Sequence, residues 1–169
     1  MAGHAISPAL ACDLNAMQAK AFARMGDHGG ARRAIRHTET AAGLIRLDEE
    51  PAETGYVQPG LLENALADTL MRLGDNGPAQ RYAAEAVEIH AHARGRVHRL
   101  ATLADCELRA GGVDQAAGTA ERMLDTVQGM ESHRLYDRLA GVRRSLATTR
   151  SASVREVVGR IDDTLRIPL

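Results

Sequence analysis

The sequence has very few aromatic side chains: one Phe, three Tyr and no Trp among 169 residues. Because 44% of the residues are apolar but only 2% are aromatic, the core must consist of Ala, Leu, Val and Ile, which suit closely packed helices. The length is enough for one domain with a real core. We therefore expect residues 1–169 to form a single all-α domain.

Other features are also missing. No apolar run is long enough to span a bilayer, and residues 1–11 lack the positive region of a signal peptide. The net charge of −1 gives no general attraction for nucleic-acid phosphates. Cys12 and Cys106 lie in separate segments with no paired framework. We expect a cytoplasmic protein with no direct nucleic-acid or membrane binding.

Catalytic and metal-binding patterns are scarce. The sequence has no GxSxG, HExxH or P-loop motif, and Asp105 beside Cys106 discourages a thiolate. His90 and His92 are two residues apart and do not face each other on a helix, and neither they nor His98 have a second pair of ligands. We predict a non-catalytic protein with no metal and no cofactor.

The central stretch, residues 61–87, reads as two amphipathic helices folded back on each other. Gly74 and Asp75 interrupt it with a left-handed turn and a helix cap, and Pro78 suits a first helical turn. The apolar residues of the two arms recur at helical spacing: Leu62, Leu66, Leu70 and Leu73, then Ala79, Ala83, Ala86 and Val87. Such a hairpin needs neighbours that bury its remaining apolar face.

The whole chain follows this pattern, with eight expected helices and no strand. The first helix, from Pro8 to Met25, has apolar residues at helical spacing: Leu10, Leu14, Met17, Ala21 and Met25. The second runs to Ile45, and an exposed acidic loop covers 46–58. The predicted hairpin units are about 8–45, 59–91 and 95–129, followed by a helix pair over 132–166.

Three turns repeat one spacing, in the segments ARMGDHGGA (23–31), MRLGDNGPA (71–79) and LRAGGVDQA (108–116). In each, a Gly is followed five residues later by an Ala and preceded seven residues earlier by another. These residues are Gly26, Gly74 and Gly111; Ala31, Ala79 and Ala116; and Ala19, Ala67 and Ala104. The small residues let paired helices touch, and the Gly makes the turn between them.

These positions resemble the tetratricopeptide repeat, which has small residues at positions eight and twenty. Its large apolar position eleven is matched by Phe22 and Leu70 and holds Glu107 in the third unit. The units are 48 and 37 residues apart, against 34 in the standard repeat. The resemblance implies antiparallel hairpins stacked in a short right-handed solenoid.

The chain as a whole also resembles the C-terminal repeat domain of actinobacterial helix-turn-helix transcriptional regulators. This resemblance rests on the repeat, on the loop after the first hairpin, and on the closing segments SHRLYDRLAGVRRSLA and VREVVGRIDDTL. Because no room precedes Ser7 for a DNA-binding domain, DNA binding does not carry over. The chain is either a stand-alone relative or a fragment.

In such arrays the first helix of each hairpin lines the concave surface, which implies a ligand-facing stripe. Its members are Ala16, Lys20 and Arg24; Asn64, Asp68 and Arg72; and Ala101, Asp105 and Arg109. Three recurring arginines could bind carboxylate or phosphate. We favour the alternative that these arginines complement their helix dipoles, and that Arg72 and Arg109 each pair with the Asp four residues earlier, Asp68 and Asp105. Tyr56 is either a lid over the groove or an ordinary packed loop residue.

These observations predict an interaction scaffold that binds a peptide or protein segment in its groove, in a regulatory role. The alternative is a small-molecule sensor or an enzyme with an enclosed pocket, ringed by Tyr56, Tyr82 or Tyr136. The helix pair over 132–166 lacks the Gly-to-Ala turn and should cap the array. Its apolar stripe could instead form a homodimer seam.

Overall fold

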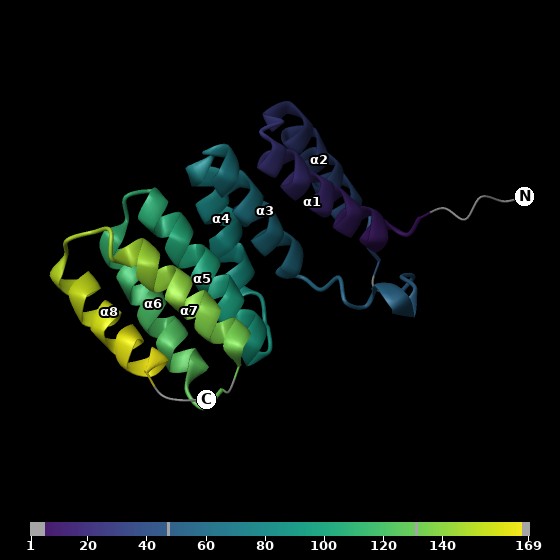
Figure 1. Ribbon diagram of the computed structural model, residues 1–169. Coiled ribbons are helices and arrows are strands. Elements are labelled where there is room, and N and C mark those ends of the chain that lie inside the picture. The colour runs from purple at the N-terminus through teal and green to yellow at the C-terminus, as the bar shows by residue number, and fades with distance from the viewer. Residues whose placement is uncertain (1–5, 47, 131, 167–169) are drawn as a thin grey trace, which may run out of the picture.

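The computed structural model describes residues 6–46, 48–130 and 132–166, and these residues form eight α-helices, one short 3-10 helix and no strand (Figure 1). The elements are α1 (Pro8–Met25), α2 (His28–Ala42), η1 (Ala52–Thr54), α3 (Leu61–Leu73), α4 (Asn76–Glu88), α5 (Ala93–Arg109), α6 (Val113–Val127), α7 (His133–Leu146) and α8 (Ala152–Leu165). The predicted all-α class is confirmed. One boundary was wrong: α2 ends at Ala42 and not at Ile45, because Gly43 caps it.

Consecutive helices pair as α1 with α2, α3 with α4, α5 with α6 and α7 with α8. The repeated glycines Gly26, Gly74 and Gly111 have φ values of 78°, 81° and 87°, as the predicted left-handed turns require. The six repeated alanines are all buried, none more than 2% exposed: Ala19, Ala31, Ala67, Ala79, Ala104 and Ala116. The small residues therefore lie where the paired helices meet.

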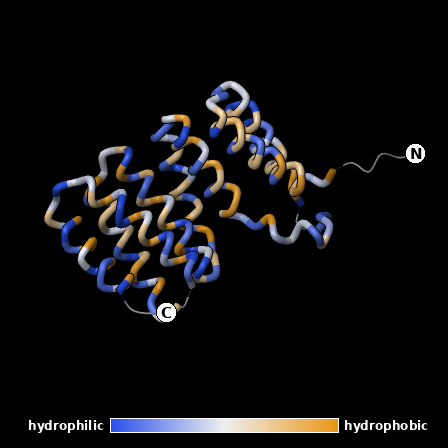
Figure 2. The backbone as a smooth tube through the Cα atoms, viewed as in Figure 1, coloured by the Kyte–Doolittle hydropathy of each residue, from blue (hydrophilic) through white to orange (hydrophobic). Residues whose placement is uncertain are grey.

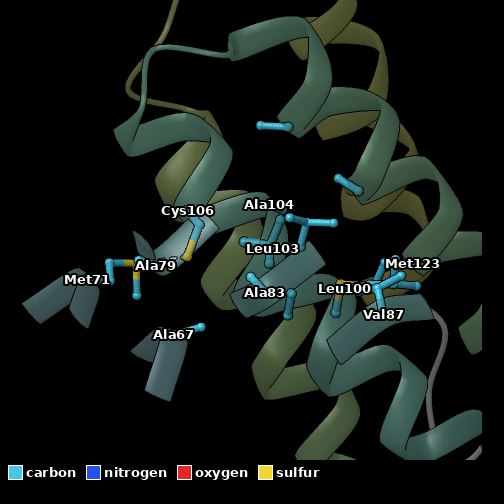
Figure 3. Packing of buried hydrophobic residues seen from close by; sticks show 14 of the residues in the cluster. Ala67, Met71, Ala79, Ala83, Val87, Leu100, Leu103, Ala104, Cys106 and Met123 are labelled. Atoms are coloured by element: carbon cyan, nitrogen blue, oxygen red, sulfur yellow. Dashed lines mark hydrogen bonds between the residues drawn. The ribbon is translucent and has the colours of Figure 1, made fainter. Parts of the chain in front are cut away.

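The odd-numbered helices form one row, in which α1 contacts α3, α3 contacts α5 and α5 contacts α7. Helix α4 also packs on α5, so a continuous core joins the pairs. Figure 3 shows Met71 of α3 and Cys106 of α5 close to Ala79 of α4, and the Cys106 Sγ lies 4.0 Å from the Met71 Sδ. This core fixes the positions of the odd-numbered helices, and therefore the spacing of the polar side chains that these helices carry.

The C-terminal pair buries the apolar stripe that the sequence offered either as a cap or as a dimer seam. Helix α7 packs on α5 and α6, and α8 packs on α6 and α7. The buried side chains are Leu135, Leu139, Val142 and Leu146 of α7 and Val154, Val157 and Ile161 of α8. This chain itself covers the stripe, so the stripe is unavailable to a second copy.

Helix α1 buries its small side chains and exposes most of its large apolar ones. Its buried side chains are Ala9, Cys12, Ala16 and Ala19, while Met17 is 61% exposed and Met25 is 78% exposed. Apart from the half-buried Leu10, the apolar stripe is therefore the solvent side of the helix, and Figure 2 shows apolar residues on α1 at the edge of the molecule. The small face is buried because it lets α1 approach α2 and α3 closely.

Candidate functional site

A groove of about 560 Å³ runs across the row of odd-numbered helices and the loop before α3. Helix α1 contributes Lys20, and the loop contributes Tyr56, Gln58 and Gly60. The remaining lining residues are Leu61, Asn64, Ala65, Asp68 and Arg72 of α3; His92, Gly95, His98, Arg99 and Thr102 at and along α5; and Arg138 of α7. Five of the eight predicted site residues meet here: Lys20, Tyr56, Asn64, Asp68 and Arg72.

Two cations in the groove share one carboxylate. The Lys20 Nζ lies 3.1 Å from the Asp68 Oδ2, and the Arg72 Nε lies 3.6 Å from the same oxygen. The second contact is the pair four residues apart that the sequence predicts. Since one carboxylate compensates only one unit of charge, this part of the groove remains positive.

The α5–α7 side of the groove is also cationic. The Arg138 Nη2 donates a 2.8 Å hydrogen bond to Thr102 Oγ1, and the described residues bring no carboxylate within 4.0 Å of Arg138. Burial, with added repulsion from Arg138 and Arg134, holds the pKa of His98 below its usual value. An anion bound between these groups would relieve this repulsion.

Arg99 builds the floor of the groove and was not predicted. Its Nη1 donates to the carbonyls of Ala86 and Ile89, both at 2.9 Å, and its Nη2 donates to the Pro59 carbonyl at 3.0 Å. The side chain is only 8% exposed, and burial lowers the pKa of Arg99. The guanidinium thus ties the end of α4 to the loop before α3.

Gly60 lies directly against this guanidinium. It has a φ of 83°, and a Cβ at this position would overlap the Arg99 side chain. A larger residue is excluded both by backbone conformation and by space. The only signal for Arg99 in the sequence is a basic residue at a core position of the apolar run that includes Leu100 and Leu103.

Two uncharged side chains, those of Tyr56 and Asn64, complete the walls of the groove. Tyr56 donates a 3.0 Å hydrogen bond from its hydroxyl to Asp13 Oδ2 on α1, and this bond raises the pKa of Tyr56. The Asn64 Oδ1 is buried without a hydrogen-bond partner among the described residues. A donor on a bound ligand would satisfy it. Tyr56 is 53% exposed, and its hydroxyl joins it to α1 at the wall of the groove.

The other predicted residues lie elsewhere. Asp105 and Arg109 line a second hollow of about 370 Å³, and Arg24 is exposed and lines neither hollow. Ala16 and Ala101 were expected to face the ligand but are buried, at 5% and 0% exposure, because small residues fill the helix contacts. The three repeated arginines therefore form no single array.

The residues expected for the alternative function, a small-molecule sensor or an enzyme with an enclosed pocket, do not lie around one pocket. Tyr82 bonds to Glu39 beside a third hollow, so Tyr56 and Tyr82 do not ring one pocket. Burial raises the pKa of the Cys106 thiol to about 12 and that of Cys12 to about 11. Within the described ranges, no three His, Cys, Asp or Glu side chains are grouped to hold a metal ion. The groove therefore presents charged and hydrogen-bonding side chains to a ligand.

Comparisons with protein-family models, with curated proteins and with solved structures found no match to this chain. Among the helices described, none combines the length and the apolar character that a membrane crossing requires.

Proposed function

We propose that this protein is a non-catalytic, tetratricopeptide-like scaffold whose groove binds an acidic peptide segment of a regulatory partner. Support for a stack of hairpins comes from the three left-handed turn glycines, the six buried alanines and the row of odd-numbered helices, and the resemblance to the repeat implies a right-handed solenoid. The final pair α7–α8 lacks the Gly-to-Ala turn and serves as the cap of the array.

The charge of the groove carries the proposal. Four of its lining side chains are basic and one is acidic: Lys20, Arg72, Arg99 and Arg138 against Asp68. The whole chain is close to neutral, with a net charge of −1, so the positive charge is local. A groove lined by one sign of charge attracts ligands of the other sign.

The length of the groove favours an extended segment over a compact molecule. Its lining residues come from four helices in a row, and neighbouring packed helices lie about 8–10 Å apart. A ligand that reaches from Lys20 to Arg138 therefore spans roughly 25–30 Å. An extended peptide covers this distance with about eight residues.

Fluorescence anisotropy with labelled octapeptides of alternating Glu and Ala, and of alternating Lys and Ala, tests the proposal. We expect the acidic peptide to bind and the basic one not to bind. Replacing Arg138 with Ala should weaken acidic-peptide binding about tenfold, since a charge-assisted hydrogen bond is worth roughly 1.5 kcal/mol. Arg155→Ala, on the exposed side of α8, is the matched control and should bind normally.

Acidification should strengthen this binding. A bound carboxylate raises the depressed pKa of His98, so binding takes up a proton, and affinity rises as the pH falls from the pKa of the bound form to that of the free form. His98→Gln should remove this dependence. Equal binding by wild type, Arg72→Ala and Arg138→Ala would refute the groove. Tight binding of inorganic phosphate with no peptide binding would favour the small-molecule alternative.

A further inference from the structure

One end of the groove carries basic side chains from two helices, at the place where α7 lies along α5 (Figure 1). Arg134 and Arg138 are four residues apart and therefore share one face of α7. His98 and Thr102 are related in the same way on α5. Three of these residues line the groove, and Arg134 is exposed beside it. We call these four residues the basic corner.

Two contacts fix the register of α5 and α7. The Arg138 Nη2 lies 2.8 Å from Thr102 Oγ1. Seven residues later on each helix, Ser145 of α7 and Arg109 of α5 line the same second hollow. Equal steps along both helices thus lead from one shared contact to the next. The two helices therefore run in parallel, side by side.

This register places Arg134 next to His98. Arg134 comes one helical turn before Arg138, and His98 comes one turn before Thr102, the residue that Arg138 contacts. Arg134 and His98 therefore face each other across the two helices. The repulsion that both arginines add to the effect of burial on the pKa of His98 agrees with this arrangement.

The described residues supply no counter-charge to the basic corner. None of their carboxylate oxygens lies within 4.0 Å of Arg134 or Arg138, in contrast to the two cations that share Asp68. The one acid of α7, Asp137, is exposed and pairs with neither arginine at that distance. Like charges four residues apart on a helix repel each other. An anion between the two helices would remove this repulsion.

The hydrogen-bond donors of the basic corner suit an anion with several oxygens. The Thr102 hydroxyl accepts from Arg138 and donates its own proton to the His98 carbonyl at 3.2 Å, so it holds the guanidinium in place. Arg138 uses only Nη2 in this contact, which leaves its Nε and Nη1 for a ligand. Two arginine forks match the geometry of a phosphoryl group. Such a group carries nearly two negative charges and three acceptor oxygens, whereas a carboxylate carries one charge and two oxygens.

We propose that the basic corner binds the phosphoryl group of a phosphoserine or phosphothreonine in the peptide segment that occupies the groove. This inference rests on the proposed function, because the groove has to hold the segment. The Asp68 end of the groove has two cations and one carboxylate, which suits a single negative charge. The basic corner has no such carboxylate and suits a doubly charged group. Because Arg134 is exposed, a free phosphate would gain little there, and the contacts of the segment along the groove supply the remaining affinity.

Fluorescence anisotropy of the full chain with labelled octapeptides of alternating Glu and Ala measures this preference. One position near either end of the peptide is phosphoserine, Glu or Ser, so that both directions of the segment along the groove are covered. We expect the better phosphoserine peptide to bind at least about tenfold more tightly than its Ser counterpart, and more tightly than the Glu peptide. Equal affinities of the phosphoserine and Glu peptides would overturn this inference and leave the proposed function standing. Failure of every peptide to bind would overturn both.

Variants of α7 locate the preference. Arg134→Ala should lower the ratio of phosphoserine-peptide affinity to Ser-peptide affinity about fivefold. The matched control is Arg144→Ala, which removes the same charge from an exposed residue of α7 outside the hollows described above and should keep the ratio of wild type. Unchanged melting curves would show that both variants fold. Equal ratios in Arg134→Ala and wild type would overturn the basic corner as the phosphoryl site. Release of the phosphoserine peptide by an equal concentration of inorganic phosphate would overturn a phosphorylated segment as the ligand.

Discussion

The two ends of the helix array handle their apolar residues in opposite ways. The C-terminal pair buries its stripe, including Val157 and Ile161 at 0% exposure, against α6 and α7. The N-terminal helix α1 buries alanines and leaves Met17 and Met25 in solvent. Equally regular apolar patterns thus serve internal packing at one end and face solvent at the other.

The two ends are also held to the rest of the molecule by different interactions. The N-terminal pair contributes mainly small side chains to the shared core, namely Ala19, Ala31, Ala34 and Ile35. Polar contacts also join it to its neighbours: Arg32 with Asp75, Glu39 with Tyr82, and Lys20 with Asp68. A small cluster around Ala9, Ala16 and Leu62 supplements them. Burial of Val, Leu and Ile contributes more free energy than exposed ion pairs do. We infer that α1–α2 opens before α7–α8.

The strongest way to test this contrast is to remove α8 by truncation after Ala147. The deletion removes three fully buried side chains, Val154, Val157 and Ile161, each worth about 1.5–3 kcal/mol. Their combined loss is comparable to the whole stability of an ordinary domain. We expect a protein that aggregates or melts without cooperativity in circular dichroism. A soluble, cooperatively folded fragment would show that α8 is not a cap.

A smaller loss of stability should follow from removing the Arg99 guanidinium, which joins the end of α4 to the loop before α3. Arg99→Met leaves the Pro59, Ala86 and Ile89 carbonyls without their donor, which should cost about 3 kcal/mol. For a chain of this length the melting temperature should fall by roughly 6–12 °C. The control, Arg138→Met, loses one hydrogen bond in the same groove and should fall less. Similar decreases in melting temperature for the two variants would mean that the three hydrogen bonds of Arg99 stabilise the fold no more than the single bond of Arg138 does.

The sequence predicted these regions with different success, for physical reasons. Helices and turns followed from the spacing of glycines and alanines, because a left-handed turn and a close helix contact each tolerate few residue types. The spacing of Leu and Met residues did not show which face of α1 is buried, since such a stripe looks like a core in any isolated helix. Periodicity cannot show that the alanine face has the closer neighbours.

The groove was predicted only in part. Lys20, Asn64, Asp68 and Arg72 follow from the register of the first helices in each hairpin, and they do lie together. Arg138 could not be found in this way, because it comes from the capping pair, outside the repeat. The hydrogen bonds of Arg99 reach two carbonyls at the end of α4 and one in the loop before α3. These carbonyls come together only in the folded chain, so no local sequence pattern predicts the contact.

The smallest expected effect tests the polar attachment at the N-terminal end. Arg32 binds both oxygens of Asp75, with donor–acceptor distances of 2.9–3.2 Å, on the exposed surface between α2 and the turn before α4. Asp75→Asn should cost only about 0.6 kcal/mol, as exposed ion pairs do. Because the buried side chains at this end are mostly alanines, which contribute less apolar area than Val or Ile, the loss should appear as local opening, and protected amides of α1 and α2 should exchange about threefold faster. The matched variant is Asp162→Asn, which removes a similar two-bond pair with Arg143 on the C-terminal helices. There the buried stripe of α8 resists opening, so exchange in α7 and α8 should hardly change. Faster exchange in the Asp162 variant than in the Asp75 variant would reverse the order of the two ends.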